Sequence, residues 1–161
     1  MTKQEISSKV QSFLQSSIKN KNVTIFEFAE SIGVKFRTLQ SYLYYNKTPD
    51  YAVYMKIYYR IYGFDSEKSE LMARQAFDNV INTIINLHNE GYTYLRMEAV
   101  TGVSHSTLYK YVKRKVDDIG LYTLVVLIER LNLGISVPGI IERKAKNNKT
   151  ALKSEPNFVK I

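Results

Sequence analysis

Two short stretches of the sequence carry side chains that can recognise a polyanion by charge and by hydrogen bonding. They are residues 35–47 and residues 104–115, which mix Lys or Arg with Ser, Tyr and, in the first stretch, Gln. An arginine can donate two hydrogen bonds to guanine and a glutamine can pair with adenine, whereas lysines neutralise phosphates. These residue types favour non-covalent recognition of a nucleic acid.

The residues that catalysis usually needs are scarce. The chain has no cysteine and two histidines, His88 and His105, so cysteine nucleophiles, disulfides and zinc sites are not expected. The sequence has no glycine-rich phosphate loop and no nucleophile elbow. We interpret Asp117-Asp118 as a turn and helix cap, and His88 as a packing residue at the rim of a helix. We therefore expect no enzymatic activity, no metal and no cofactor.

Positive charge is unevenly distributed along the chain. The net charge is +8, and residues 1–69 carry ten Lys/Arg against six Asp/Glu, residues 70–142 seven against eight, and residues 143–161 six against one. This sign suits a partner with a phosphate backbone or an anionic surface. The start is amphipathic, and no stretch reaches the roughly 18 apolar residues of a membrane span. We expect a cytoplasmic, nucleoid-associated protein with no membrane partner.

The spacing of apolar residues predicts an all-α fold with about eight helices and no strand. Capping patterns at Thr2/Glu5 and Thr24/Glu27 mark two helix starts, and Gly33 marks a helix end. Thr48-Pro49 is interpreted as a cap followed by a proline in the first turn. The expected helices cover residues 3–20, 24–33, 36–45, 48–63, 66–89, 93–102, 104–115 and 121–132.

The sequence repeats itself at an offset of 69 residues, which becomes 70 after one extra loop residue. The matched pairs are Thr24/Thr93, Gly33/Gly102, Val34/Val103, Thr38/Thr107, Leu39/Leu108, Tyr42/Tyr111, Ile57/Leu127, Arg60/Arg130 and Ile61/Leu131. We interpret this as two copies of one four-helix unit. The expected organisation is a domain over 1–65, a second domain over 66–142 that begins with a long helix, and a basic, disordered tail over 143–161.

Residues 25–44 have a spacing typical of a helix-turn-helix. The small Ala29 lets two helices approach, and Gly33 allows a turn with positive φ. The remaining pattern positions are apolar and wedge the helices apart at a fixed angle: Phe28, Ile32, Val34, Leu39 and Tyr42. This block resembles the Cro/phage-repressor class, the XRE-like helix-turn-helix family, over about residues 2–64.

Residues 94–113 repeat this spacing with two departures. Glu98 takes the small-residue position and Thr101 takes an apolar one. Because a carboxylate is costly to bury, we expect either that the helix pair opens slightly or that Ala99 takes over the close contact.

The resemblance implies that bases face the start and the outer surface of the second helix of each block. In the first unit these residues are Lys35, Phe36, Arg37, Gln40, Ser41 and Tyr44, together with Lys47, and in the second Ser104, His105, Ser106, Tyr109, Lys110, Lys113 and Arg114. Arg37 would read guanine and Gln40 adenine, whereas Phe36 could touch only a thymine methyl. Ser104 should also cap its helix. The alternative for each residue is an ordinary solvated helix surface.

Two functions remain open on this basis. The first is a sequence-specific regulator that binds double-stranded DNA, a repressor of bacterial or phage type. The second is an antirepressor or inhibitor that uses the helix-turn-helix to dock a regulatory protein or peptide. Tyrosines are dense between Tyr42 and Tyr62. We interpret them mainly as packing aromatics, with a homodimer face as the alternative.

Overall fold

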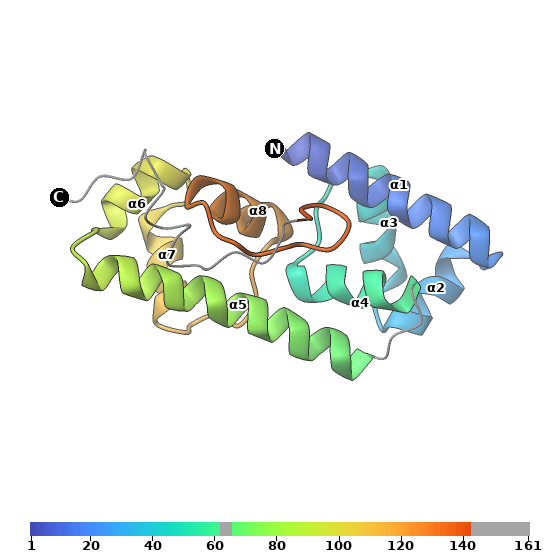
Figure 1. Ribbon diagram of the computed structural model, residues 1–161. Helices are drawn as coiled ribbons and strands as arrows, with labels where there is room; N and C mark the ends of the chain where they lie inside the picture. Colours follow the sequence, from blue (N-terminus) through green and yellow to red (C-terminus); the bar gives the residue numbers. More distant parts are fainter. Residues whose placement is uncertain (62–65, 143–161) are drawn as a thin grey trace. The chain divides into compact units, whose positions relative to one another are not determined.

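The structure is a computed structural model that describes residues 1–61 and 66–142. Its helices are α1 (Lys3–Lys21), α2 (Ile25–Ile32), α3 (Phe36–Tyr44), α4 (Tyr51–Ile61), α5 (Ser66–Asn89), α6 (Tyr94–Thr101), α7 (His105–Val112) and α8 (Leu121–Arg130) (Figure 1). Within these residues there is no strand, and the β-bridges are isolated. The all-α fold with two tandem helix-turn-helix units is confirmed. The expected tail over 143–161 and the helix end at Gly63 lie outside the described residues.

Two helices, α4 and α7, differ most from their expected ranges, each for a local reason. The first helical hydrogen bond of α4 joins the Tyr54 amide to the Asp50 carbonyl, so Pro49 precedes the helix and is not in its first turn. The Pro49 carbonyl instead accepts a hydrogen bond from the Leu121 amide at 2.9 Å. α7 ends at Val112 and does not reach Lys115, because Arg114 adopts a φ of 56°.

The chain forms two compact units. Among the described residues, unit 1 comprises Met1–Ala73 with Gly120–Tyr122, and unit 2 comprises Arg74–Ile119 with residues 123–142. The division falls inside α5, so the first turns of this helix belong to unit 1. There Lys56 of α4 pairs with Glu70 at 3.8 Å. No helix in the described part of the chain is both long enough and apolar enough to cross a membrane.

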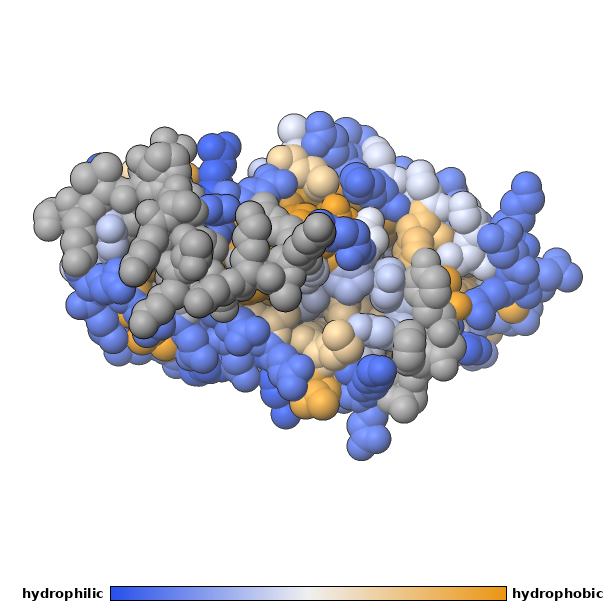
Figure 2. Space-filling model, in the orientation of Figure 1, coloured by the Kyte–Doolittle hydropathy of each residue, from blue (hydrophilic) through white to orange (hydrophobic). Residues whose placement is uncertain are grey.

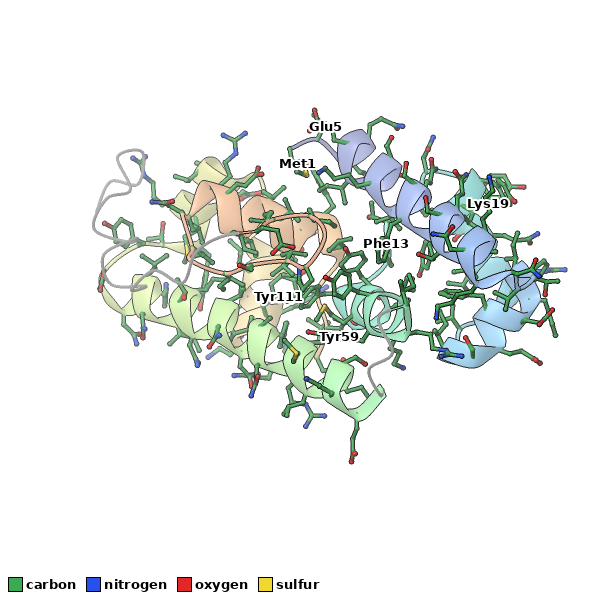
Figure 3. The ribbon with its side chains drawn as sticks, turned by 45° about the vertical axis from the view of Figure 1, so that its right-hand side comes forward. Met1, Glu5, Phe13, Lys19, Tyr59 and Tyr111 are labelled. Carbon is green, nitrogen blue, oxygen red and sulfur yellow. The ribbon has the colours of Figure 1, made fainter. Side chains whose placement is uncertain are left out.

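In unit 1, α1 and α2 both pack against α3. The buried face of α1 carries Ile6, Val10 and Leu14 at helical spacing, as a helix that buries one stripe requires. Phe13 points from α1 towards α4 and stacks on Tyr58 with a centroid separation of 5.6 Å (Figure 3).

The tyrosine-rich segment serves mainly the core of unit 1. Four of its tyrosines are buried, which confirms the packing interpretation for them: Tyr42, Tyr51, Tyr54 and Tyr59. Burial raises the pKa of Tyr51 far above its usual value, because desolvation disfavours the phenolate. Tyr44 and Tyr45 are instead exposed.

In unit 2, α5 supplies an apolar stripe and a polar outer surface. Phe77, Ile81 and Ile84 are buried with Met97 of α6 and Leu108 of α7. Hydrophilic residues line α5 on the face shown in Figure 2. Ile81 and Ile84 of α5 therefore belong to the core of unit 2.

The repeat extends to the ends of α1 and α5, which the sequence comparison did not match. Asn22 and Gly91 stand 69 residues apart and both have positive φ, 53° and 106°. The closing backbone hydrogen bonds are also equivalent: Asn22 to Lys19 and Val23 to Ile18 in unit 1, Gly91 to His88 and Tyr92 to Leu87 in unit 2. Asn and Gly differ as letters but are the two residues that best tolerate this conformation.

Gly33→Ala tests how far the left-handed turn stabilises unit 1. A Cβ built at Gly33 would meet no atom within 4 Å, so only the φ of +70° opposes the substitution. We expect Ala to lower the free energy of unfolding by about 1 kcal/mol. Urea denaturation followed by circular dichroism measures this. Gly33→Asn is the matched control and should cost clearly less, and equal costs for the two variants would contradict the conformational explanation.

Candidate nucleic-acid interface

Each unit contains two short helices joined by the same kind of turn. The pairs are α2–α3 and α6–α7, and their first helices end at Gly33 and Gly102 with φ values of 70° and 76°. Their first helices also begin alike, because the hydroxyls of Thr24 and Thr93 each accept a hydrogen bond from a backbone amide in the first turn.

The second helices of the two pairs begin differently. The Ser104 hydroxyl accepts a hydrogen bond from the Thr107 amide at 3.3 Å, which confirms it as the cap of α7. Lys35 holds the same position before α3 and makes no side-chain cap. The amides at the start of α3 are therefore less well satisfied than those of α7.

The outer surface of α3 carries cations without an intramolecular partner. Lys35, Arg37 and Lys47 are exposed, and none of them pairs with another residue in 1–61 or 66–142. Gln40 and Ser41 are half-buried on the same helix, and the Ser41 hydroxyl donates to the Thr38 carbonyl at 2.6 Å. This surface offers free cationic donors beside a glutamine amide.

Aromatic rings border this surface. Phe36 is partly exposed and lies 6.0 Å, centroid to centroid, from Phe26 of α2, which is 53% exposed. Tyr44 is exposed at the end of α3. The sequence-based set does not contain Phe26. Its position two residues before the buried Phe28 of α2 already indicates that it faces away from the core.

The Tyr109 ring of α7 contacts two lysines at the C-terminal end of this helix. The ammonium groups of Lys113 and Lys115 lie 5.8 and 5.5 Å from the centre of the Tyr109 ring, within cation–π range. Lys110 is exposed on the same helix and forms no ion pair with a described residue. Lys115 therefore belongs to this basic surface together with Lys110 and Lys113.

Further rings support Tyr109 from α6 and α5. Tyr94 meets it edge to face at 6.0 Å, and His88 stacks on Tyr94 at 4.2 Å with an interplanar angle of 8°. Burial and the neighbouring Tyr109 raise the pKa of Tyr94, so its ring stays neutral. The expected packing role of His88 is confirmed.

Arg114 is placed differently from the lysines around it. Its guanidinium pairs with Asp78 of α5 and lies 5.9 Å from the centre of the Phe77 ring. The same residue has the positive φ that ends α7. The side chain of Arg114 thus packs against α5, whereas Lys110, Lys113 and Lys115 are exposed to solvent.

The two departures from the helix-turn-helix pattern are accommodated locally. Ala99 is exposed, so the expectation that it takes over the close helix contact is wrong. Glu98 keeps its carboxylate at the surface and bonds His105, with Nδ1 to Oε2 at 2.8 Å. The buried Thr101 hydroxyl donates to the Met97 carbonyl at 2.7 Å and accepts from the Val103 amide at 3.1 Å. Neither Glu98 nor Thr101 has a buried side-chain polar atom without a hydrogen-bond partner.

The sequence-predicted residues thus form two separate sets, one on and beside α3 and one on and beside α7. His105 and Ser106 are exposed at the start of α7, where the Ser106 hydroxyl lies 3.3 Å from the Ser104 hydroxyl.

Comparisons of the chain with protein-family models, with curated proteins and with solved structures find no match.

The contacts of Arg114 predict a stability role that Lys110 lacks. Arg114→Ala should lower the free energy of unfolding by about 1 kcal/mol, because it removes a partly exposed ion pair and a cation–π contact. Lys110→Ala should change it by less than about 0.5 kcal/mol. Urea denaturation of both variants, with Asp78→Asn and the double variant, gives the coupling energy. Additive effects of Arg114→Ala and Asp78→Asn would contradict the predicted pairing.

Proposed function

We propose that this protein is a sequence-specific regulator that binds double-stranded DNA and represses transcription by occluding a promoter. The observation that supports this most directly is the placement of unpaired cations on the second helix of both repeated helix pairs. Arg37 stands on α3, and Lys110 on α7. Free cations on a helix that can enter the major groove suit phosphate and base-edge contacts.

The two surfaces differ in chemistry, so we propose that α3 recognises bases and α7 binds phosphates. On α3, Arg37 and Gln40 can make paired hydrogen bonds to guanine and adenine. On α7, Lys110, Lys113 and Lys115 neutralise phosphates, which strengthens binding to any sequence. Both units then contact DNA, and the protein acts at the nucleoid in the cytoplasm.

The alternative function is an antirepressor or inhibitor that binds a regulatory protein. The exposed aromatic side chains around α3, Phe26, Phe36 and Tyr44, favour this alternative because such rings are enriched at protein interfaces. The two functions differ in salt dependence, since release of counterions from DNA has no equivalent in an aromatic interface.

DNA affinity should fall steeply with salt. If α3 and α7 both contact phosphates, binding should release about five or more counterions per chain. Fluorescence anisotropy on a duplex from upstream of the protein's own gene, at several salt concentrations, measures the slope. A flat dependence would favour the protein-binding alternative.

Paired substitutions should separate base recognition from phosphate binding. Arg37→Ala with Gln40→Ala should reduce the preference for the selected site, each good bidentate contact contributing about 1–3 kcal/mol. Lys110→Ala with Lys113→Ala should weaken binding to all duplexes alike.

The matched control is Lys3→Ala with Lys9→Ala on α1, which removes the same charge as the α7 pair. It should have a smaller effect than either double variant. If only one of the two double variants changes binding while both proteins remain folded, the shared-contact model is wrong.

A further inference from the structure

We propose that Glu98 and His105 form a specificity-determining pair in unit 2. In this pair Glu98 orients the imidazole of His105, whose Nε2 accepts a hydrogen bond from the exocyclic amino group of adenine or cytosine in the major groove. The proposal rests on the proposed function, because it assigns a base contact to the start of α7.

The hydrogen bond between the two side chains fixes the tautomer of His105. Oε2 of Glu98 lies 2.8 Å from Nδ1 of His105. An ionised carboxylate only accepts hydrogen bonds, so Nδ1 carries the proton. In the neutral ring Nε2 then has a free lone pair and acts as an acceptor. No residue in the described part of the chain bonds Nε2.

The position of the ring suits a base contact. His105 is the first residue of α7, and its side chain is 55% exposed. Residues at the start of such a helix are those that reach base edges in helix-turn-helix proteins. In the major groove, amino groups that donate are found on adenine N6 and cytosine N4, whereas guanine and thymine present acceptors.

The turn between α6 and α7 fixes the backbone that carries the two side chains. The Glu98 carbonyl accepts a hydrogen bond from the Gly102 amide at 2.8 Å, and the Thr101 hydroxyl bonds the Val103 amide. The backbone of Glu98 therefore lies in the ordered last turn of α6, and the Ser104 hydroxyl caps α7. A ring oriented in this way loses less conformational freedom on binding than a free surface histidine.

Unit 1 has no equivalent pair. At an offset of 69 residues, Ala29 stands for Glu98 and Phe36 stands for His105. Ala29 is buried, and the Phe36 ring has no hydrogen-bonding atom. The two residues that differ from unit 1 at these positions, Glu98 and His105, thus form one hydrogen bond, and the repeat supplies natural substitutions with which to remove it.

The tautomer can be tested without DNA. In the full-length protein at pH 8, where an imidazole is neutral, ¹⁵N–¹H correlation spectra of the histidine rings distinguish the two tautomers. We expect the Nδ1–H form for His105 in the wild type and a loss of that preference in Glu98→Gln, whose amide can donate as well as accept. A wild-type ring in the Nε2–H form would overturn the proposal.

The base preference is tested by selection of bound duplexes from a random pool at pH 8. We expect the wild-type site to contain one position that favours adenine or cytosine over guanine and thymine by about three- to tenfold, the effect of one hydrogen bond. His105→Phe should abolish this preference, and Glu98→Gln should weaken it. Glu90→Gln removes the same charge at the end of α5 and serves as the control.

The outcomes separate this proposal from the one on which it rests. An unchanged site preference in His105→Phe overturns the role of the pair but leaves DNA binding intact. A wild type that binds no duplex overturns both.

Discussion

The surface of each unit depends on the left-handed turn at the end of a short helix. At Gly33 and at Gly102 the chain takes a positive φ, which stops the first helix, and only three residues separate it from the next helix. Such a short connection fixes the direction of the second helix and decides which of its side chains face solvent. The turn thus sets which polar residues α3 presents on the outer surface of unit 1, and which residues α7 presents on that of unit 2.

The two units use this common frame for different surface chemistry. α3 has free cations beside a glutamine and a border of exposed rings, whereas α7 has lysines organised by Tyr109 and a histidine held by Glu98. These lysines, rings and the histidine lie on exposed positions, and the buried positions Leu39 and Leu108 keep the same residue type, whereas the buried Ile32 is matched by the buried Thr101. Packing therefore constrains the repeat from inside, while the outer surface is free to diverge.

Much of the fold follows from local signals, because helix caps and apolar spacing act over a few residues. The caps at Thr24, Thr93 and Ser104 were readable in this way. The misjudged features depend on contacts distant in sequence. Arg114 pairs with Asp78, 36 residues away. α7 ends at Val112, just before the positive φ of Arg114. Likewise the exposure of Ala99 follows from how α6 packs, which its own spacing did not reveal.

The long helix α5 has a consequence for how this gene could have arisen. By the 69-residue offset, the first residue of α1, Lys3, corresponds to Met72, yet α5 begins earlier, at Ser66. The added turns belong to unit 1, where Glu70 meets Lys56 and the Met72 sulfur accepts a hydrogen bond from Tyr59. If a duplication produced the two copies, the boundary between the copies and the boundary between the folded units no longer coincide, because residues 66–73 of α5 fold with unit 1. Unit 1 then depends on residues at the start of α5 for its fold. One copy excised at the repeat boundary would leave its neighbour incomplete.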